Sequence, residues 1–207
     1  YLKYADIYKS ANANLAVDKL EQLKAIEPSN AAVDKKLAEI YYLKNDFSKA
    51  ADAYSRFAMG PMATEDDLVK YAFALFLNHD FAKSLEVVDM GLKKNSRHAA
   101  FNRLAMYNYV DLKRFEDALK AADTFFNESD KADYSYLDYM YYGHLLESLK
   151  KYDAAVGQYE KAVEMDPTKT DLYKNISFAY EQENNYKKAI EAYHKYYSSL
   201  EKEKQTP

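Results

Sequence analysis

Hydrophobic and small residues recur along this chain at helical spacing, most clearly over residues 139–167. The first half of that stretch carries them at i, i+3, i+4 and i+7, as Tyr139, Tyr142, Gly143 and Leu146. The second half repeats the pattern with Ala155, Tyr159 and Ala162. Pro167 then ends the helix, because proline cannot continue a helix interior. The stretch predicts two antiparallel helices that approach each other most closely at their small residues.

The same pattern recurs at a fixed period. An aromatic residue opens each expected second helix, at separations of 34, 34, 37 and 34 residues: Phe47, Phe81, Phe115, Tyr152 and Tyr186. Three positions later comes a small residue in every case: Ala50, Ser84, Ala118, Ala155 and Ala189. Such a period predicts stacked helical pairs that bury their core between neighbours.

These residues resemble the tetratricopeptide repeat, whose signature is W-x2-L-G-x2-Y, then A-x3-F, then P. The resemblance covers nearly the whole chain and implies an all-α, right-handed superhelical solenoid of about six antiparallel helix pairs. We expect one array over residues 1–204 and a tail over 205–207, with repeats at about 1–30, 31–64, 65–98, 99–132, 136–169 and 170–203. Three additional residues, Asp133 to Ser135, account for the single spacing of 37.

Several places depart from the signature, including Asn102 and Met106 in the fourth repeat, where Leu and Gly would be expected. The first repeat is the least regular, with Tyr1, Tyr4 and Tyr8 in its first helix, and Asp34 stands where an aromatic residue or Leu is usual. Tyr196 occupies a place where a small residue would admit another helix, so we expect the array to stop there. The face beyond it turns polar, as a surface in contact with water should.

Composition narrows the classes of function. A content of 48% hydrophobic residues with four Gly and four Pro suits short turns between helices and no sheet. The chain has 29 Lys plus Arg against 33 Asp plus Glu, a net charge of -4, and no long basic run, which argues against nucleic acid as a partner. No apolar run is long enough to cross a membrane and no signal peptide is visible, so we expect no direct membrane insertion.

The absence of cysteine excludes disulfides and thiolate sites, and it leaves the compartment open between cell envelope and cytoplasm. The sequence opens with Tyr1 rather than Met, so we expect it to be a part of something longer.

The sequence shows no pattern of catalytic or metal-ligating residues. The four histidines, which are His79, His98, His144 and His194, are scattered over four repeats with no H-E-x-x-H pair. Neither a G-x-S-x-G motif nor a phosphate-binding glycine loop is present. We therefore expect no enzyme activity, no metal and no cofactor.

The resemblance does identify candidate binding residues, because non-signature positions of the first helix in this family point into a concave groove. Carried over, the candidates are Tyr42, Lys70, Phe73, Phe76, Arg103, Tyr107, Met140, Tyr141, His144, Lys174 and Phe178. Exposed apolar stripes usually mark contact surfaces. The alternative is that some of these side chains pack against the neighbouring repeat. The set that grips chaperone tails in one subset of the family is absent, since Glu39 stands where Asn is required.

The favoured interpretation is a non-catalytic module that binds a protein or peptide segment in its concave groove. Two alternatives stay open. The segment could be a structural or self-associating scaffold, with the aromatic stripe as a homo-oligomer interface, or it could recruit substrate for an enzyme domain elsewhere in a longer protein. Fold alone does not decide among them.

Overall fold

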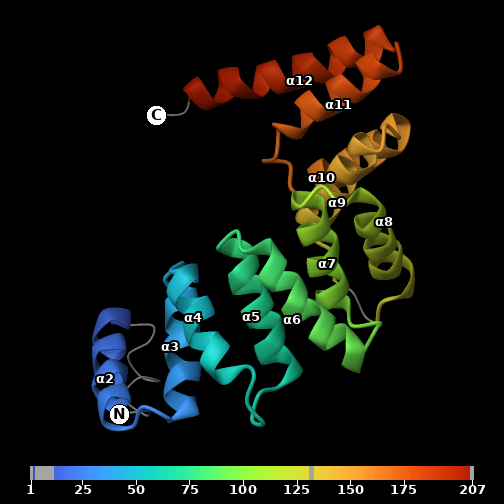
Figure 1. Ribbon diagram of the computed structural model, residues 1–207. Helices are drawn as coiled ribbons and strands as arrows, with labels where there is room; N and C mark the ends of the chain where they lie inside the picture. The colour runs from blue at the N-terminus through green and yellow to red at the C-terminus, as the bar shows by residue number, and fades with distance from the viewer. Residues whose placement is uncertain (1, 3–11, 131–132, 206–207) are drawn as a thin grey trace. The chain divides into compact units, whose positions relative to one another are not determined.

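A computed structural model of the protein describes residues 2, 12–130 and 133–205, with the backbone alone for 201–205. In these ranges every regular element is a helix (Figure 1), which confirms the all-α prediction for this part of the chain. The first helix expected around Tyr1, Tyr4 and Tyr8 lies outside the described residues. Contacts divide the chain into two compact units, 1–104 and 105–207. The single array over 1–204 stays a prediction.

Unit 1 is a row of antiparallel helix pairs. It contains α2 (Ala13–Ile26), α3 (Ala31–Leu43), α4 (Phe47–Phe57), α5 (Glu65–Leu77), α6 (Phe81–Lys94) and the first turns of α7 (Ala99–Asp111). Figure 1 shows α3 beside α4 and α5 beside α6, and α4 also packs on α5. The core lies between these helices, because each amphipathic helix turns its apolar stripe toward the next one.

Unit 2 continues the same scheme. It contains the rest of α7, then α8 (Phe115–Asp123), the π-helix η1 (Thr124–Glu128), α9 (Tyr136–Ser148), α10 (Tyr152–Met165), α11 (Leu172–Gln182) and α12 (Tyr186–Gln205). Helix α10 packs against both α9 and α11, and α11 packs against α12. Within both units every second helix from α4 onward begins at the aromatic residue that defined the sequence period. Helix α11 begins at Leu172, because Thr170 and Asp171 lie in a turn.

A recurring turn joins the two helices of each pair. Its central residue has a positive φ of 57 to 61° in five repeats: Asn45, His79, Lys113, Lys150 and Asn184. The following backbone N–H returns to a carbonyl five residues earlier, as in Asp46 N to Tyr41 O at 2.9 Å. This left-handed C-terminal cap ends the first helix and reverses the chain within a few residues. In the first of these turns Asp46 then caps α4 by accepting from Lys49 N at 3.3 Å.

The packing of the helices accounts for Asp34 at a position where an aromatic residue or Leu is usual. Its buried carboxylate accepts from Lys24 Nζ of α2 at 2.5 Å and from Arg56 Nε of α4 at 2.8 Å. A charged side chain can replace the usual apolar one at this position because partners on both neighbouring helices compensate its loss of hydration. The departure from the signature is therefore an ion-pair junction between three helices of unit 1.

A close crossing of α9 and α10 was expected at Gly143 and Ala155, and in unit 2 the two helices pack tightly at Gly143. Both residues are buried, and a Cβ added to Gly143 would lie 2.5 Å from a ring carbon of Tyr159. The Tyr159 ring is itself 0% exposed, and its hydroxyl donates to Glu147 Oε2 of α9 at 2.7 Å. The space beside Gly143 in α9 is thus filled by the Tyr159 ring of α10, which is buried and whose hydroxyl is hydrogen-bonded to Glu147.

Candidate functional site

Unit 1 contains a groove of about 580 Å³ on the side formed by its first helices. The lining residues come mainly from α3, α5 and the start of α7, with one contribution from α4: Glu39, Tyr42, Leu43, Tyr54, Val69, Lys70, Phe73, Ala100, Arg103 and Leu104. We call this the unit 1 groove. Its size falls within the range of ordinary ligand sites in proteins, roughly 300–1,000 Å³.

The groove has an aromatic floor and wall. Tyr54 is only 1% exposed, and its ring lies 6.4 Å from that of Tyr71. Burial raises the pKa of the Tyr54 hydroxyl, with neighbouring carboxylates adding to the effect, so the phenol stays neutral. Tyr42 is half-buried with its ring edge-on to Phe47 at 5.6 Å, which restrains the orientation of the ring. These rings form a preformed apolar surface.

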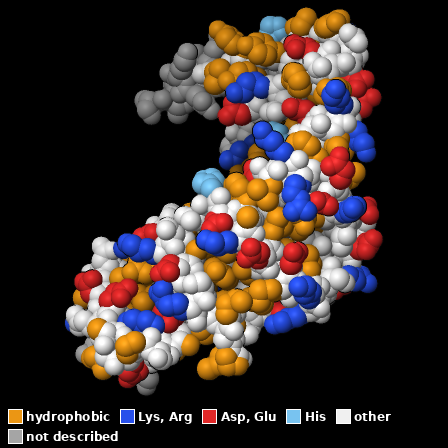
Figure 2. Space-filling view, viewed as in Figure 1, with side chains coloured by type: hydrophobic (Ala, Val, Ile, Leu, Met, Phe, Trp, Pro, Cys, Tyr) orange, Lys and Arg blue, Asp and Glu red, His pale blue; other side chains and the backbone are white. Residues whose placement is uncertain are grey.

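Charged groups of both signs border this apolar surface. Lys70 Nζ lies 2.7 Å from Asp66 Oδ2 one turn earlier on α5, and this hydrogen bond raises the pKa of Lys70. Glu39 and Arg103 also line the groove, from α3 and α7. Over unit 1 the face seen in Figure 2 shows the same character, with red and blue side chains interspersed among orange ones. The arrangement suits a ligand with an apolar side chain between polar or charged groups.

An ion pair holds the two main walls together. Lys35 Nζ of α3 lies 2.8 Å from Asp67 Oδ1 of α5, whose side chain is 1% exposed. Desolvation raises the pKa of Asp67, but hydrogen bonds from Lys35 and Thr64 lower it by more, so the net pKa is below its usual value. Thr64 and Asp67 also form a capping box at the start of α5, with both of its hydrogen bonds present. The spacing between successive first helices is therefore fixed by an ion pair as well as by packing.

Four of the candidates from the sequence line the unit 1 groove: Tyr42, Lys70, Phe73 and Arg103. Phe76, the fifth candidate in this unit, lies beside the groove instead. Its ring packs between Phe73 at 6.0 Å and Phe81 at 5.7 Å, measured between ring centroids. Two further lining residues, Leu43 and Leu104, were absent from the candidate set. Each directly follows an accepted candidate, Tyr42 or Arg103, in its first helix, and this adjacency is the signal that could have identified it.

In unit 2 the groove candidate Tyr107 is buried instead of open to a ligand. The side chain is 2% exposed, its hydroxyl donates to Asp138 Oδ1 at 2.7 Å, and its ring stacks on Tyr141 at 4.1 Å. The resemblance carried Tyr107 over as a groove position of α7, but residues of α9 cover it. Tyr141 is half-buried above it and donates to Asp111 Oδ2 at 3.0 Å.

The other candidates in unit 2 do not gather in one cavity. Met140 is partly buried against the core of the last two helix pairs, and His144 Nδ1 lies 3.0 Å from the Tyr159 hydroxyl. Lys174 pairs with Asp171 at 3.3 Å, and Phe178 is 42% exposed with its ring edge-on to Tyr152. Most of these side chains have structural partners within unit 2.

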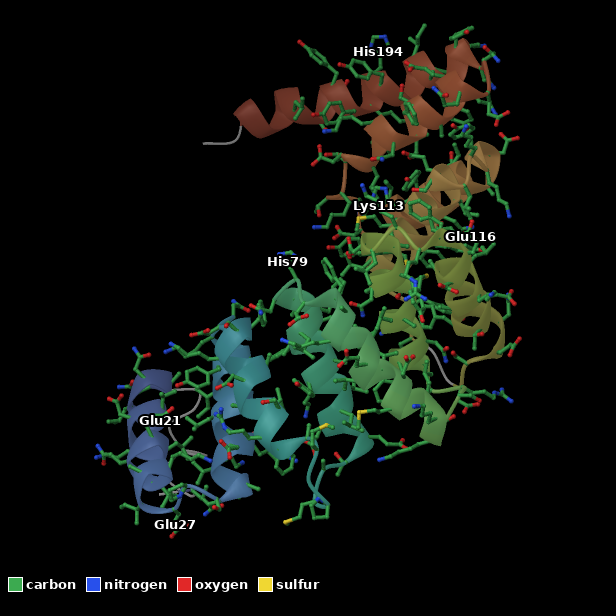
Figure 3. The ribbon with its side chains drawn as sticks, in the orientation of Figure 1. Glu21, Glu27, His79, Lys113, Glu116 and His194 are labelled. Carbon is green, nitrogen blue, oxygen red and sulfur yellow. The ribbon has the colours of Figure 1, made fainter. Side chains whose placement is uncertain are left out.

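The histidines show separate environments rather than a shared site. His79 is the left-handed residue of the turn after α5, and Figure 3 labels it there. Burial lowers the pKa of His144, although Glu147 and Asp111 act in the opposite direction. In the described ranges, no three His, Cys, Asp or Glu side chains are grouped so that they could hold a metal ion. The same part of the chain contains no helix with the length and apolarity of a membrane span.

Comparison with known proteins confirms the family resemblance. Residues 139–203 match the family model described as tetratricopeptide repeat. The solved structure of MamA 41-end from Desulfovibrio magneticus RS-1 is similar, with a TM-score of 0.71 at 17% identity over 85% of this chain and 96% of that one. The MamA RS-1 ArsTM double mutant gives a TM-score of 0.72 at 17% identity, over 86% of this chain and 97% of the other. A comparison with curated proteins gives no match.

At this level of identity the solved structures establish a shared fold of packed helix pairs. Tetratricopeptide repeats are generally non-catalytic interaction modules. The family match over α9 to α12 and the shared fold are those of a protein-interaction or scaffold module. The ligand of such a module has to be argued from its own surface.

Proposed function

We propose that this chain is a protein-interaction module that binds a peptide segment in the unit 1 groove, without chemistry of its own. The observation that carries the proposal is the convergence of Tyr42, Lys70, Phe73 and Arg103 on one groove of about 580 Å³. These side chains come from three successive first helices. A segment laid across them therefore meets an anchor on each helix, at intervals of about one helix diameter, ~10 Å.

The chemistry of the groove defines the kind of segment. The apolar surface around Tyr42 and Phe73 accepts an aliphatic or aromatic side chain, and aromatic contacts of this type supply much of the binding energy in protein interfaces. Glu39 on the α3 wall favours a basic or amide donor, whereas Lys70 and Arg103 favour acceptors such as carboxylates and backbone carbonyls. The opposite charges on the two walls give the bound segment a preferred direction.

Two features make the groove preorganised. The buried ion pair between Lys35 and Asp67 fixes α3 relative to α5, and Tyr54 supports the floor from α4. A rigid groove does not lose conformational entropy when it binds, so more of the contact energy appears as affinity.

Selection of peptides from a random display library on the full chain tests the proposal, followed by affinity measurements on variants. Phe73→Ala should weaken the selected peptides by about tenfold or more, because truncating an aromatic anchor typically costs ~2 kcal/mol. Lys70→Glu should select against acidic peptides in particular. Phe178→Ala is the control, since this aromatic side chain of α11 is 42% exposed, belongs to unit 2 and does not line the groove.

If the selected peptides bind the Phe73→Ala variant as tightly as the unmodified chain, the binding surface lies elsewhere. Sedimentation at increasing concentration addresses the scaffold alternative, because a monomer at all concentrations removes self-association from consideration.

A further inference from the structure

The last helix, α12, carries an apolar stripe that no other described part of unit 2 covers. Four large side chains on one face of the helix are half or more exposed: Tyr186 at 60%, Ile190 at 57%, Tyr193 at 52% and Tyr197 at 52%. Their spacing of 4, 3 and 4 residues keeps them in line along the helix. We call this set the α12 stripe. The stripe lies mostly before the polar face expected beyond Tyr196, and only Tyr197 follows that residue.

The repeat shows what such a stripe contacts when it is covered. Moving back 34 residues, the equivalents of the α12 stripe are Tyr152, Val156, Tyr159 and Val163 of α10. These four are buried or partly buried in one hydrophobic cluster with α11, whose contributions include Leu172, Ile176 and Ala179. The same surface is thus covered by a first helix in repeat five and uncovered in repeat six.

The acceptor of one polar contact recurs at the same offset. In the covered case, Asn175 Nδ2 of α11 lies 3.5 Å from Glu147 Oε2 of α9. The equivalent of Glu147 is Glu181 of α11, which is exposed. Glu181 lines a hollow of about 250 Å³ together with Ser177, Ala189, Ile190, Tyr193 and His194. Figure 3 labels His194 on α12 at this place. A covering helix would fill the hollow and supply a donor to Glu181.

Tyr196 does not block this surface, although it occupies a position where a small residue is usual. The Lys174 ammonium lies 4.7 Å from the centre of the Tyr196 ring, so the ring leans toward α11 of its own repeat. The Tyr196 ring also lies edge-on to Tyr193 at 6.0 Å, yet Tyr193 and Tyr197 stay exposed, so the stripe is open on both sides of it.

We propose that the α12 stripe is a docking surface for an amphipathic helix from a partner, which binds antiparallel to α12 as α11 binds to α10. The partner helix carries aliphatic or small residues at i, i+4 and i+7, corresponding to Leu172, Ile176 and Ala179, and an amide or cationic donor at i+3 that meets Glu181. Its amino-terminal end lies near Tyr197. The proposal concerns a second surface and does not depend on the unit 1 groove.

A second copy of this chain fits the stripe less well. Four half-exposed side chains amount to roughly 400 Å² on each copy if a large side chain contributes about 200 Å² when fully exposed. Symmetric pairing through the stripe alone would therefore bury about 800 Å² in total, below the ~1,200 Å² of most stable interfaces. A helix that also enters the hollow beside Glu181 uses more of the available surface.

The test uses the full chain and, as the probe, a fluorescent synthetic peptide with the sequence of residues 168–184, which contains α11. Fluorescence anisotropy should show saturable binding, and Ile190→Lys should weaken it by about tenfold or more. Ile26→Lys is the matched control, because Ile26 at the end of α2 is 68% exposed in unit 1 and should leave binding unchanged. A peptide with Ile176→Lys should not bind.

The donor is tested by a double-mutant cycle between Asn175→Ala in the peptide and Glu181→Gln in the protein, in which the two losses should be less than additive. Equal binding to the Ile190→Lys chain, or no saturable binding at all, would overturn the proposal. Concentration-dependent dimers that Ile190→Lys abolishes would also overturn it, since the occupant would then be a second copy.

Discussion

Two glycines of neighbouring helices in unit 2 offer a sharp test of the packing. Gly143 lies in α9, where an added Cβ would meet ring carbons of Tyr159 at 2.5 and 2.6 Å. Gly157 lies in α10, where an added Cβ would meet nothing within 4 Å. We predict that Gly157→Ala stabilises the protein and that Gly143→Ala destabilises it.

The magnitudes follow from two opposing terms. Replacing Gly by Ala in a helix interior gains about 0.5–1 kcal/mol, because the unfolded chain loses conformational freedom, and this term is common to both sites. At Gly143 the new methyl must displace a ring that is 0% exposed and whose hydroxyl is held by Glu147 at 2.7 Å. Overpacking of this kind costs about 1–3 kcal/mol. Because the helix term cancels in the comparison, the two variants should differ by about 1–3 kcal/mol.

Urea titration followed by circular dichroism measures the two free energies of unfolding. Adding Tyr159→Leu provides the internal check, because removal of the ring should make Gly143→Ala neutral or stabilising in that background. If the two glycine substitutions stabilise the protein equally, the close contact between α9 and the Tyr159 ring does not exist, and the register of this helix pair is wrong.

Three further predictions address other positions. Ala155→Leu should destabilise the protein by about 1–3 kcal/mol in the same titration, since the site is 0% exposed, whereas Lys187→Ala on the surface of α12 should stay within about 0.5 kcal/mol. Asp34→Asn should cost about 1–3 kcal/mol, because it leaves two cations beside a buried neutral amide, and an unchanged midpoint would show that the ion pairs contribute nothing. Burial lowers the folded-state pKa of His144, so the unfolded chain binds its proton more readily. Stability should therefore fall as the pH drops below about 6.5, and His144→Gln should reduce that loss; an identical pH profile in the variant would contradict the assignment.

The sequence by itself determined the helix pairs and their period. The 34-residue repeat of aromatic and small residues encodes the start of each second helix, because a ring at that position and a small residue one turn later are needed at every crossing. The resemblance to the repeat family, and not the period alone, identified Tyr42, Lys70, Phe73 and Arg103 as groove positions, and these four line the unit 1 groove. Helical periodicity fixes the direction in which a side chain leaves its helix, and the resemblance indicates which of these directions face the groove.

Only the tertiary structure decided which of these directions lead to open surface. Tyr107 was a groove candidate, yet its ring is buried beneath Tyr141 and its hydroxyl donates a hydrogen bond to Asp138. The burial of a side chain depends on the helix that packs against it as well as on its position in its own helix. The reverse holds for Tyr193, whose repeat equivalent Tyr159 is covered by α11 while Tyr193 is exposed. Equivalent residues at 34-residue spacing can thus be core in one repeat and surface in the next, since a solenoid buries each repeat only where a neighbour packs against it.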